Sequence, residues 1–191
     1  MKYFTLLALP LLLTGCFANY RQSVELDLLP EDSAAQLSAM PTARIGVIRN
    51  NSGAGLPIVI RLKDGLVETD EYARWLMSPD QMLERELHRT LNTTDFTSVR
   101  LTGNVLTCEF DRSSQQAVLE VSFEARKGKH FKRLKKRFTA PVKLKDNSDA
   151  REQASAMAKA MSICYRQACL AAADLINEVN KQNNSHTTKG E

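Results

Sequence analysis

The sequence predicts an α+β fold in a single domain, in which a mainly antiparallel sheet carries two principal helices on one face. Several short segments alternate apolar and polar residues with the period of two that is typical of strands. Two other segments repeat apolar residues at helical spacing. The chain has 191 residues and 43% hydrophobic residues, which suits one hydrophobic core. We expect the domain to cover residues 43–180.

The first fifteen residues have the layout of a bacterial export signal. Lys2 precedes an apolar run from Phe4 to Leu13, and a run of about ten residues is too short to span a membrane, which takes about 20. The run ends in Leu13-Thr14-Gly15-Cys16, which resembles the lipobox of bacterial lipoproteins. That resemblance implies a signal peptide over residues 1–15 and a covalent lipid, including palmitate, on Cys16. The alternative is an ordinary secretory signal followed by an ordinary cysteine.

The residue after the lipobox cysteine is Phe17, where an aspartate would favour retention in the inner membrane. The lipoprotein sorting scheme therefore implies an outer-membrane anchor facing the periplasm, with the inner membrane as the alternative. Residues 16–42 are expected to be the lipidated N-terminus and its tether, and Val24-Glu25-Leu26 is a candidate for a short edge strand.

The first half of the domain begins with strands. We expect a strand over residues 43–48, a loop over 49–55, and a second strand in which Ile58, Ile60 and Leu62 alternate with other residues. The turn signal Asp64-Gly65 predicts a hairpin with residues 66–69 as the returning strand.

A helix should follow this hairpin. Tyr72, Trp75 and Leu76 have helical spacing and indicate its approach. The segment Ser78-Pro79-Asp80-Gln81 has the form of a helix start, with Ser78 as the N-cap and Gln81 three residues later. One apolar face of this helix should then carry Leu83, Leu87 and Leu91.

The second half predicts a strand hairpin and a long helix. Leu106, Cys108 and Phe110 should share one face of a strand, and residues 117–125 alternate most regularly in the chain. Residues 127–129 form the turn to a strand that carries Leu134 and Phe138 on one side. Ser148 or Asp149 should cap a helix over residues 149–180, and the polar tail 181–191 should be disordered.

The cysteines are compatible with one disulfide. In an oxidising periplasm Cys108 can pair with Cys164 or with Cys169, whereas Cys164 and Cys169 are poorly placed to pair with each other along a helix. The sequence shows no Cys-x-x-Cys and only scattered histidines, so no metal site is predicted. We find no catalytic set either, and expect a protein that is not an enzyme.

A run of basic residues stands out in the strand after residue 129. It contains Lys132, Arg133, Lys135, Lys136 and Arg137, and no acidic residue lies between Glu124 and Asp146. One interpretation is a solvated strand whose lysines protect a sheet edge. The other is a basic patch that faces anionic lipid headgroups or an acidic partner. The net charge of +4 does not by itself imply nucleic acid, and export from the cytoplasm argues against nucleic acid as the partner.

The stretch from Leu56-Pro57 to Leu91 resembles the ABC-type transport auxiliary lipoprotein family. The matching features are a Leu-Pro before a strand, a hairpin, and Tyr72-Ala73-Arg74-Trp75 at a helix start with Pro79 shortly after. The lipobox, the chain length and the Ala-rich last helix agree with it. The segment after Cys16 departs from the family pattern, in which a tyrosine-rich first strand is expected.

This resemblance implies a non-enzymatic periplasmic component of a lipid transport system. Its partners would be an MCE-domain protein, an inner-membrane ABC-type or related permease, and membrane lipid, and the chain itself could form homo-oligomers. Apart from the lipid on Cys16 no cofactor is implied. Tyr72 and Trp75 would be either core or partner-contact residues. The alternative is a structural subunit of another envelope assembly, such as the lipoprotein of the lipopolysaccharide translocon.

Overall fold

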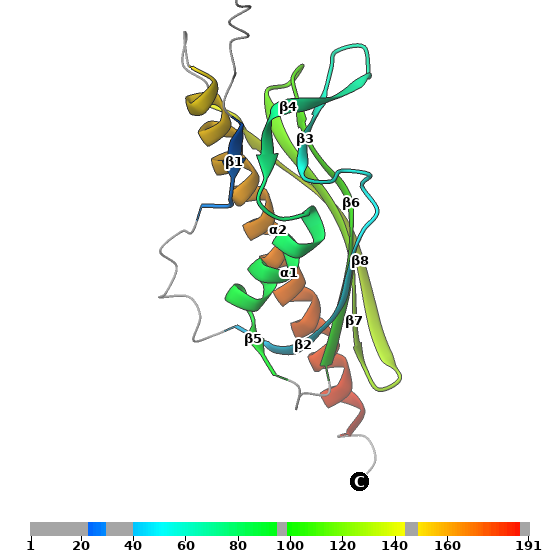
Figure 1. Ribbon diagram of the computed structural model, residues 1–191. Helices are drawn as coiled ribbons and strands as arrows, with labels where there is room; N and C mark the ends of the chain where they lie inside the picture. Colours follow the sequence, from blue (N-terminus) through cyan, green and yellow to red (C-terminus); the bar gives the residue numbers. More distant parts are fainter. Residues whose placement is uncertain (1–22, 30–39, 95–98, 144–148, 188–191) are drawn as a thin grey trace, which may run out of the picture.

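The computed structural model describes residues 23–29, 40–94, 99–143 and 149–187, with the side chains of Glu71, Tyr72 and residues 183–187 left out (Figure 1). Cys16 and the rest of the predicted signal segment lie outside the described residues. The strands are β1 (Val24–Leu26), β2 (Thr42–Asn50), β3 (Pro57–Arg61), β4 (Val67–Trp75), β5 (Asn92–Thr93), β6 (Val99–Asp111), β7 (Gln116–Lys127) and β8 (His130–Pro141). The helices are α1 (Pro79–Thr90) and α2 (Ala150–Thr187).

The strands form one mixed sheet around β6. Its long pairings are antiparallel, with β7 between β6 and β8, and β3 is antiparallel to β4. Along the other edge of β6, two strands pair with it in parallel, one after the other. β2 pairs as far as Asn50 opposite Val105, and β3 then pairs at Ile60 opposite Phe110. At the far edges β1 is parallel to β4 and β5 is parallel to β2.

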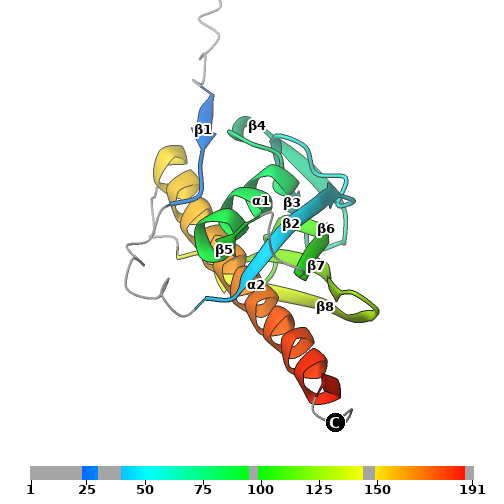
Figure 2. The ribbon, with the colours of Figure 1, turned by 90° about the horizontal axis from the view of Figure 1, so that it is seen from below.

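Both helices lie on the same face of this sheet, so the predicted α+β fold is confirmed. Figures 1 and 2 show α2 running obliquely across β7 and β8, with α1 beside it and next to β2. We call the face that the helices cover the inner face, and the opposite one the outer face. Ala117, Leu119, Val121, Phe123 and Ala125 of β7 point inward and are buried, which confirms the alternation predicted for this strand.

Helix α1 starts where its capping sequence predicts. The Ser78 N–H donates to the Gln81 side chain at 3.1 Å, and Pro79 occupies the first turn. Leu83, Leu87 and Leu91 are buried on one side of the helix, as expected. On α2 the cap is Asp149, whose carboxylate accepts the Glu152 N–H at 2.8 Å; Ser148 lies outside the described residues.

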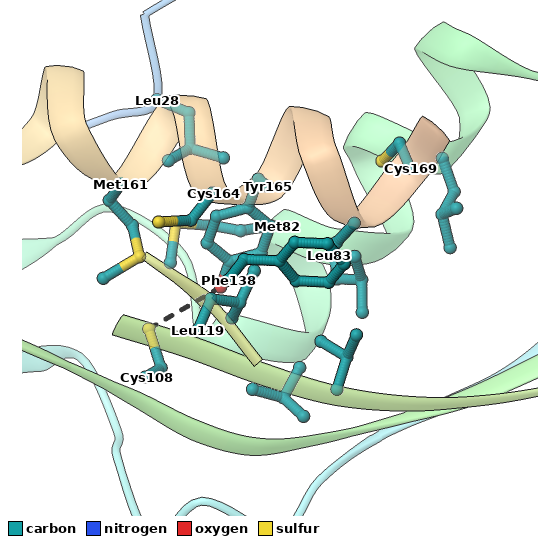
Figure 3. Close-up of a cluster of buried hydrophobic side chains, with 14 of the residues drawn as sticks. Leu28, Met82, Leu83, Cys108, Leu119, Phe138, Met161, Cys164, Tyr165 and Cys169 are labelled. Carbon is teal, nitrogen blue, oxygen red and sulfur yellow. Dashed lines mark hydrogen bonds between the residues drawn. The ribbon is translucent and has the colours of Figure 1, made fainter. Parts of the chain in front are cut away.

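The core between helices and sheet contains one buried tyrosine that joins three elements. The Tyr165 hydroxyl of α2 donates to the Pro79 carbonyl of α1 at 3.0 Å and lies 3.7 Å from Cys108 Sγ of β6 (Figure 3). Met82, Leu119 and Phe138 surround it. Because a buried hydroxyl without a partner is costly, this bond fixes how α2 sits on α1.

The predicted helical approach at residues 72–76 is wrong. These residues belong mostly to strand β4, where Glu25 lies opposite Arg74 and Leu26 opposite Trp75. Ala73 and Trp75 are buried while Arg74 between them is exposed, which is the period of a strand. Leu76 is 52% exposed. Pairing on both sides of β4 outweighs the short helical spacing in the sequence.

A bulge in β6 changes which residues face inward. The register with β7 shifts between Val105 and Thr107, so Val105 and Cys108 are buried and Leu106 is only partly buried. The expectation that Leu106 shares a face with Cys108 is therefore wrong. The shift lies where β2 ends and β3 has not yet begun along the other side of β6, and bulges are found where pairing is interrupted.

The folded domain extends beyond the predicted limits 43–180 at both ends. Leu26 and Leu28 are buried in the core, and the Leu29 N–H donates to Ser162 Oγ of α2 at 2.9 Å. The tether before the domain therefore ends at β1 and not at residue 42. Helix α2 continues to Thr187, past the start of the tail predicted for residues 181–191; residues 188–191 lie outside the described part of the chain.

Candidate functional site

The basic residues predicted as one patch lie on both faces of the edge strand β8. Lys132 and Lys136 point to the helical side, where Lys132 Nζ is 3.4 Å from Glu178 of α2 and Lys136 lies over the Phe138 ring. Arg133, Lys135 and Arg137 alternate with them on the outer face. The prediction of a single basic patch is therefore wrong, because side chains of a strand alternate between its faces. The predicted patch comprises Lys132, Arg133, Lys135, Lys136 and Arg137.

The outer face collects further arginines from strands that are distant in sequence. Register places Arg44 opposite Arg100 and Arg49 opposite Asn104 across β2 and β6, and Arg100 opposite Arg126 across β6 and β7. Arg133 adds a guanidinium from β8. We call this surface the arginine face, made of Arg44, Arg49, Arg100, Arg126 and Arg133.

A shallow hollow of about 330 Å³ lies in the arginine face. Arg49, Arg100 and Arg126 line it together with the polar side chains of Thr102 and Asn104. Within the described residues, neither Arg49 nor Arg100 has an acidic group in ion-pair distance. Two exposed guanidiniums without counter-charge, lining one hollow on a rigid sheet, attract carboxylate or phosphate groups.

Gly46 allows Arg100 to lie flat on the sheet. A Cβ at Gly46 would be 2.7 Å from Arg100 Nε and 2.8 Å from Thr102 Cγ2, which is closer than atoms of this kind approach. The glycine thus lets the side chain cross the neighbouring strand β2. The position of Arg100 is built into the sheet and does not depend on a contact with an acid.

Glu124, the one carboxylate of the described residues that lines this hollow, already has hydrogen-bond partners. Glu124 Oε2 accepts Arg133 Nε at 2.7 Å and Glu124 Oε1 accepts Arg126 Nη2 at 3.0 Å. These bonds, first Arg133 and then Arg126, lower the pKa of Glu124. Both guanidiniums also lie 5.3 Å from the centre of the exposed Phe131 ring. Two arginines per carboxylate leave a net positive charge next to Arg49 and Arg100.

Tyr72 and Trp75, the two residues singled out by the family resemblance, belong to β4 and not to the arginine face. Trp75 is 2% exposed and stacks on Phe110, with ring centroids 6.2 Å apart, so it lies in the core. The backbone of Tyr72 lies in β4, and its side chain is not described. Cys16, the predicted lipidation site, lies outside the described residues.

The three remaining cysteines are free thiols in the core. Cys108 faces the Tyr165 hydroxyl, and Cys164 Sγ lies 3.6 Å from the Ala117 carbonyl oxygen. The structure does not contain the predicted disulfide of Cys108 with Cys164 or Cys169. Burial raises the pKa of each of these thiols to about 12. They are therefore protonated and unreactive at neutral pH.

Among the described residues, no group of three or more His, Cys, Asp or Glu side chains is placed to hold a metal. His88 is exposed on α1, with Nδ1 3.2 Å from Thr93 Oγ1. Neither described helix is long and apolar enough to cross a membrane.

The sequence matches no protein family model and no curated protein. Solved structures with a similar fold include two proteins. One is a Xanthomonas campestris protein described as belonging to the family DUF330, with 14% identity and a TM-score of 0.55, covering 86% of this chain and 99% of that one. The other is described only as an uncharacterized protein, with 11% identity and a TM-score of 0.54, covering 83% of this chain and 99% of that one. At these identities the likeness concerns the fold alone.

Apart from Arg133, which belongs to the basic run of β8, the arginine face was not predictable from the sequence. Arg44, Arg49 and Arg100 do not belong to any charged run, and only the register of β2 on β6 brings them together. The single signal available in advance was that each occupies a polar position next to an inward-facing residue, such as Ala43, Ile48 and Leu101.

Proposed function

We propose that the chain is a lipid-anchored, non-enzymatic component of an MCE-type lipid transport system in the cell envelope. The lipobox ending at Cys16 supports the anchor, and the likeness of residues 56–91 to the auxiliary lipoprotein family supports the system. The structural observation that carries the proposal is the arginine face. It is a preformed cationic surface, only partly neutralised by Glu124, on the side of the sheet that the helices leave uncovered.

A surface of this kind suits the docking of an acidic partner protein. Complementary charges raise the association rate and fix the orientation of a complex. In this proposal the partner is the MCE-domain protein, and an inner-membrane permease completes the system. The chain would hold its partner close to the outer membrane, where the lipid on Cys16 places it.

The test uses the full-length chain in the envelope of the bacterium that produces it. Radiolabelled palmitate should enter the wild-type protein and not Cys16→Ser, because the thioether and the new N-terminus both require that cysteine. Isolation of the wild-type chain in mild detergent should bring an MCE-domain protein with it. Label in both proteins would contradict the anchor.

Isolation of the wild-type chain in mild detergent also distinguishes this proposal from the second candidate function, a subunit of another envelope assembly. A lipoprotein of the lipopolysaccharide translocon would be recovered with an outer-membrane barrel protein and without an MCE-domain protein. That result would replace the transport proposal and leave the anchor intact.

A further inference from the structure

Strand β1 fixes the direction in which the chain leaves the domain toward its anchor. Val24 lies opposite Ala73 and Leu26 opposite Trp75 in a parallel pairing. Because parallel strands run in the same direction, the backbone enters β1 from the side on which β4 begins. Strand β4 starts at the turn of the β3–β4 hairpin, which projects at one end of the molecule in Figure 1.

The tip of that hairpin is apolar and held outward. Leu66 is 63% exposed and Val67 is 52% exposed, and Leu66 is the most exposed large hydrophobic side chain among the described residues. The turn is fixed by backbone bonds from the Leu62 N–H to the Leu66 oxygen at 2.8 Å and from the Gly65 N–H to the Leu62 oxygen at 3.0 Å. Gly65 has a φ of 83°, which favours glycine.

The charges at the tip have local partners. The Asp64 carboxylate accepts the Leu66 N–H at 3.1 Å, and Glu68 forms an ion pair with Arg112 at 3.0 Å. Lys63 is exposed beside them. Because the tip carries both positive and negative charges, it has no strong electrostatic field. Contact made at the tip therefore depends on its apolar side chains.

The length of the tether fits contact between this tip and the membrane. Eight residue steps from Cys16 to Val24 span at most about 29 Å when extended. Along β3 the tip is four steps beyond Pro57, which lies opposite Arg74, or about 13 Å. The tether therefore lets Cys16 reach the level of Leu66. The hollow of the arginine face begins about 23 Å back along β6, counted from Asp111 to Asn104.

We propose that Leu66 and Val67 rest in the headgroup layer of the membrane that holds the lipid on Cys16. This rests on the lipid anchor proposed above. Two side chains bind a membrane only weakly on their own, but a short tether makes their contact intramolecular and raises its effective concentration. The domain then stands on its hairpin end, and the hollow of the arginine face lies farther from the bilayer, in the periplasm.

The test uses the mature chain from Cys16, coupled through its thiol to a maleimide lipid in phosphatidylcholine vesicles. This coupling replaces cellular lipidation, and Cys108, Cys164 and Cys169 do not compete because they are buried. Leu66→Trp reports on the tip, and brominated phosphatidylcholine quenches tryptophan that enters the headgroup region. Val47→Trp is the matched control, since Val47 is 54% exposed on the outer face. Trp75 gives the same buried background in both variants.

Bromolipid should quench Leu66→Trp and leave Val47→Trp unchanged. A flexible Gly/Ser insertion between Cys16 and Ser23 should weaken the quenching, because a longer tether lowers the effective concentration. Quenching of Val47→Trp alone, of both variants equally, or of neither would overturn the proposed orientation. Absence of palmitate on Cys16 in cells would overturn the anchor and leave this vesicle result standing, so the two failures are distinguishable.

Discussion

At the scale of single residues, two buried polar side chains, Glu109 and Tyr165, make specific contacts that the charge pattern of the sequence does not reveal. Glu109 is 5% exposed, and its carboxylate accepts Arg61 Nε at 2.7 Å and Nη2 at 2.8 Å. Tyr165 joins α1, α2 and β6 through one hydroxyl. Burial of such groups is tolerated only because each has its partner.

Trp75 should behave as a core residue. Trp75→Ala removes the ring that packs on Phe110 and leaves a cavity, which should lower the free energy of unfolding by about 3–5 kcal/mol. Urea unfolding of the variant measures this. Leu76→Ala is the control, because Leu76 is next to it and 52% exposed, and it should change little. A normally stable Trp75→Ala that fails to bind its partner would contradict the core assignment.

The buried thiols should be unreactive in the folded protein. Burial holds the pKa of Cys108 and Cys169 at about 12, so almost no thiolate exists at neutral pH. A thiol reagent such as Ellman's should therefore react slowly with Cys16→Ser, and react with all of its cysteines once urea unfolds the chain. Mass spectrometry of the non-reduced protein gives the complementary result. Finding a bridge from Cys108 would show that the free thiols of the structure oxidise in the periplasm.

At the scale of elements, two ion pairs help to hold β1 and the residue after it on the domain, Glu25 with Arg74 of β4 and Asp27 with Arg85 of α1. Arg85 of α1 donates to Asp27 through two bonds, one of them 2.9 Å long, just after β1. The hydrogen bond from Arg85 lowers the pKa of Asp27 below its ordinary value of 3.8. This pair, with the buried Leu28, fastens the end of the tether to the helices.

The pH dependence of this contact follows from the lowered pKa. The unfolded chain binds the proton more tightly than the folded one, so the pair stabilises the fold above about pH 4, and the effect is lost as pH falls through the folded pKa. Asp27→Asn should therefore lower the urea midpoint at neutral pH, and its difference from wild type should vanish in acid. A difference that is the same at both pH values would mean that the charge of Asp27 does not matter.

Particular elements show how far the sequence could predict this fold. The strand over residues 117–125 and the start of α1 at Ser78 follow from local signals, alternation in one case and a capping sequence in the other. Strand β4 does not follow from a local signal. Its apolar residues have helical spacing, and pairing with β1 and β3 overrides that preference. The arginine face depends on the register between strands separated in the chain, and a local pattern carries no information on register.

At the scale of the whole molecule, the proposals give the domain two functional ends. The β3–β4 hairpin lies at one end, and the arginine face occupies the uncovered side of the sheet farther along. Helix α2 has 38 residues and is thus about 57 Å long, which makes it the longest element in the structure. A lipid anchor at one end and a cationic docking surface beyond it would let the chain connect the membrane to a partner in the periplasm.

The most direct test of this account is whether the arginine face holds the partner. Arg49→Ala/Arg100→Ala should fold normally, because neither residue makes an ion pair with a described residue, and should lose co-purification of the MCE-domain protein by about tenfold or more at low salt. The matched control, Arg89→Ala/Arg151→Ala, removes the same charge from the helical layer, where both residues are exposed, and should keep the partner. Equal recovery of the MCE-domain protein with both double variants would contradict the account.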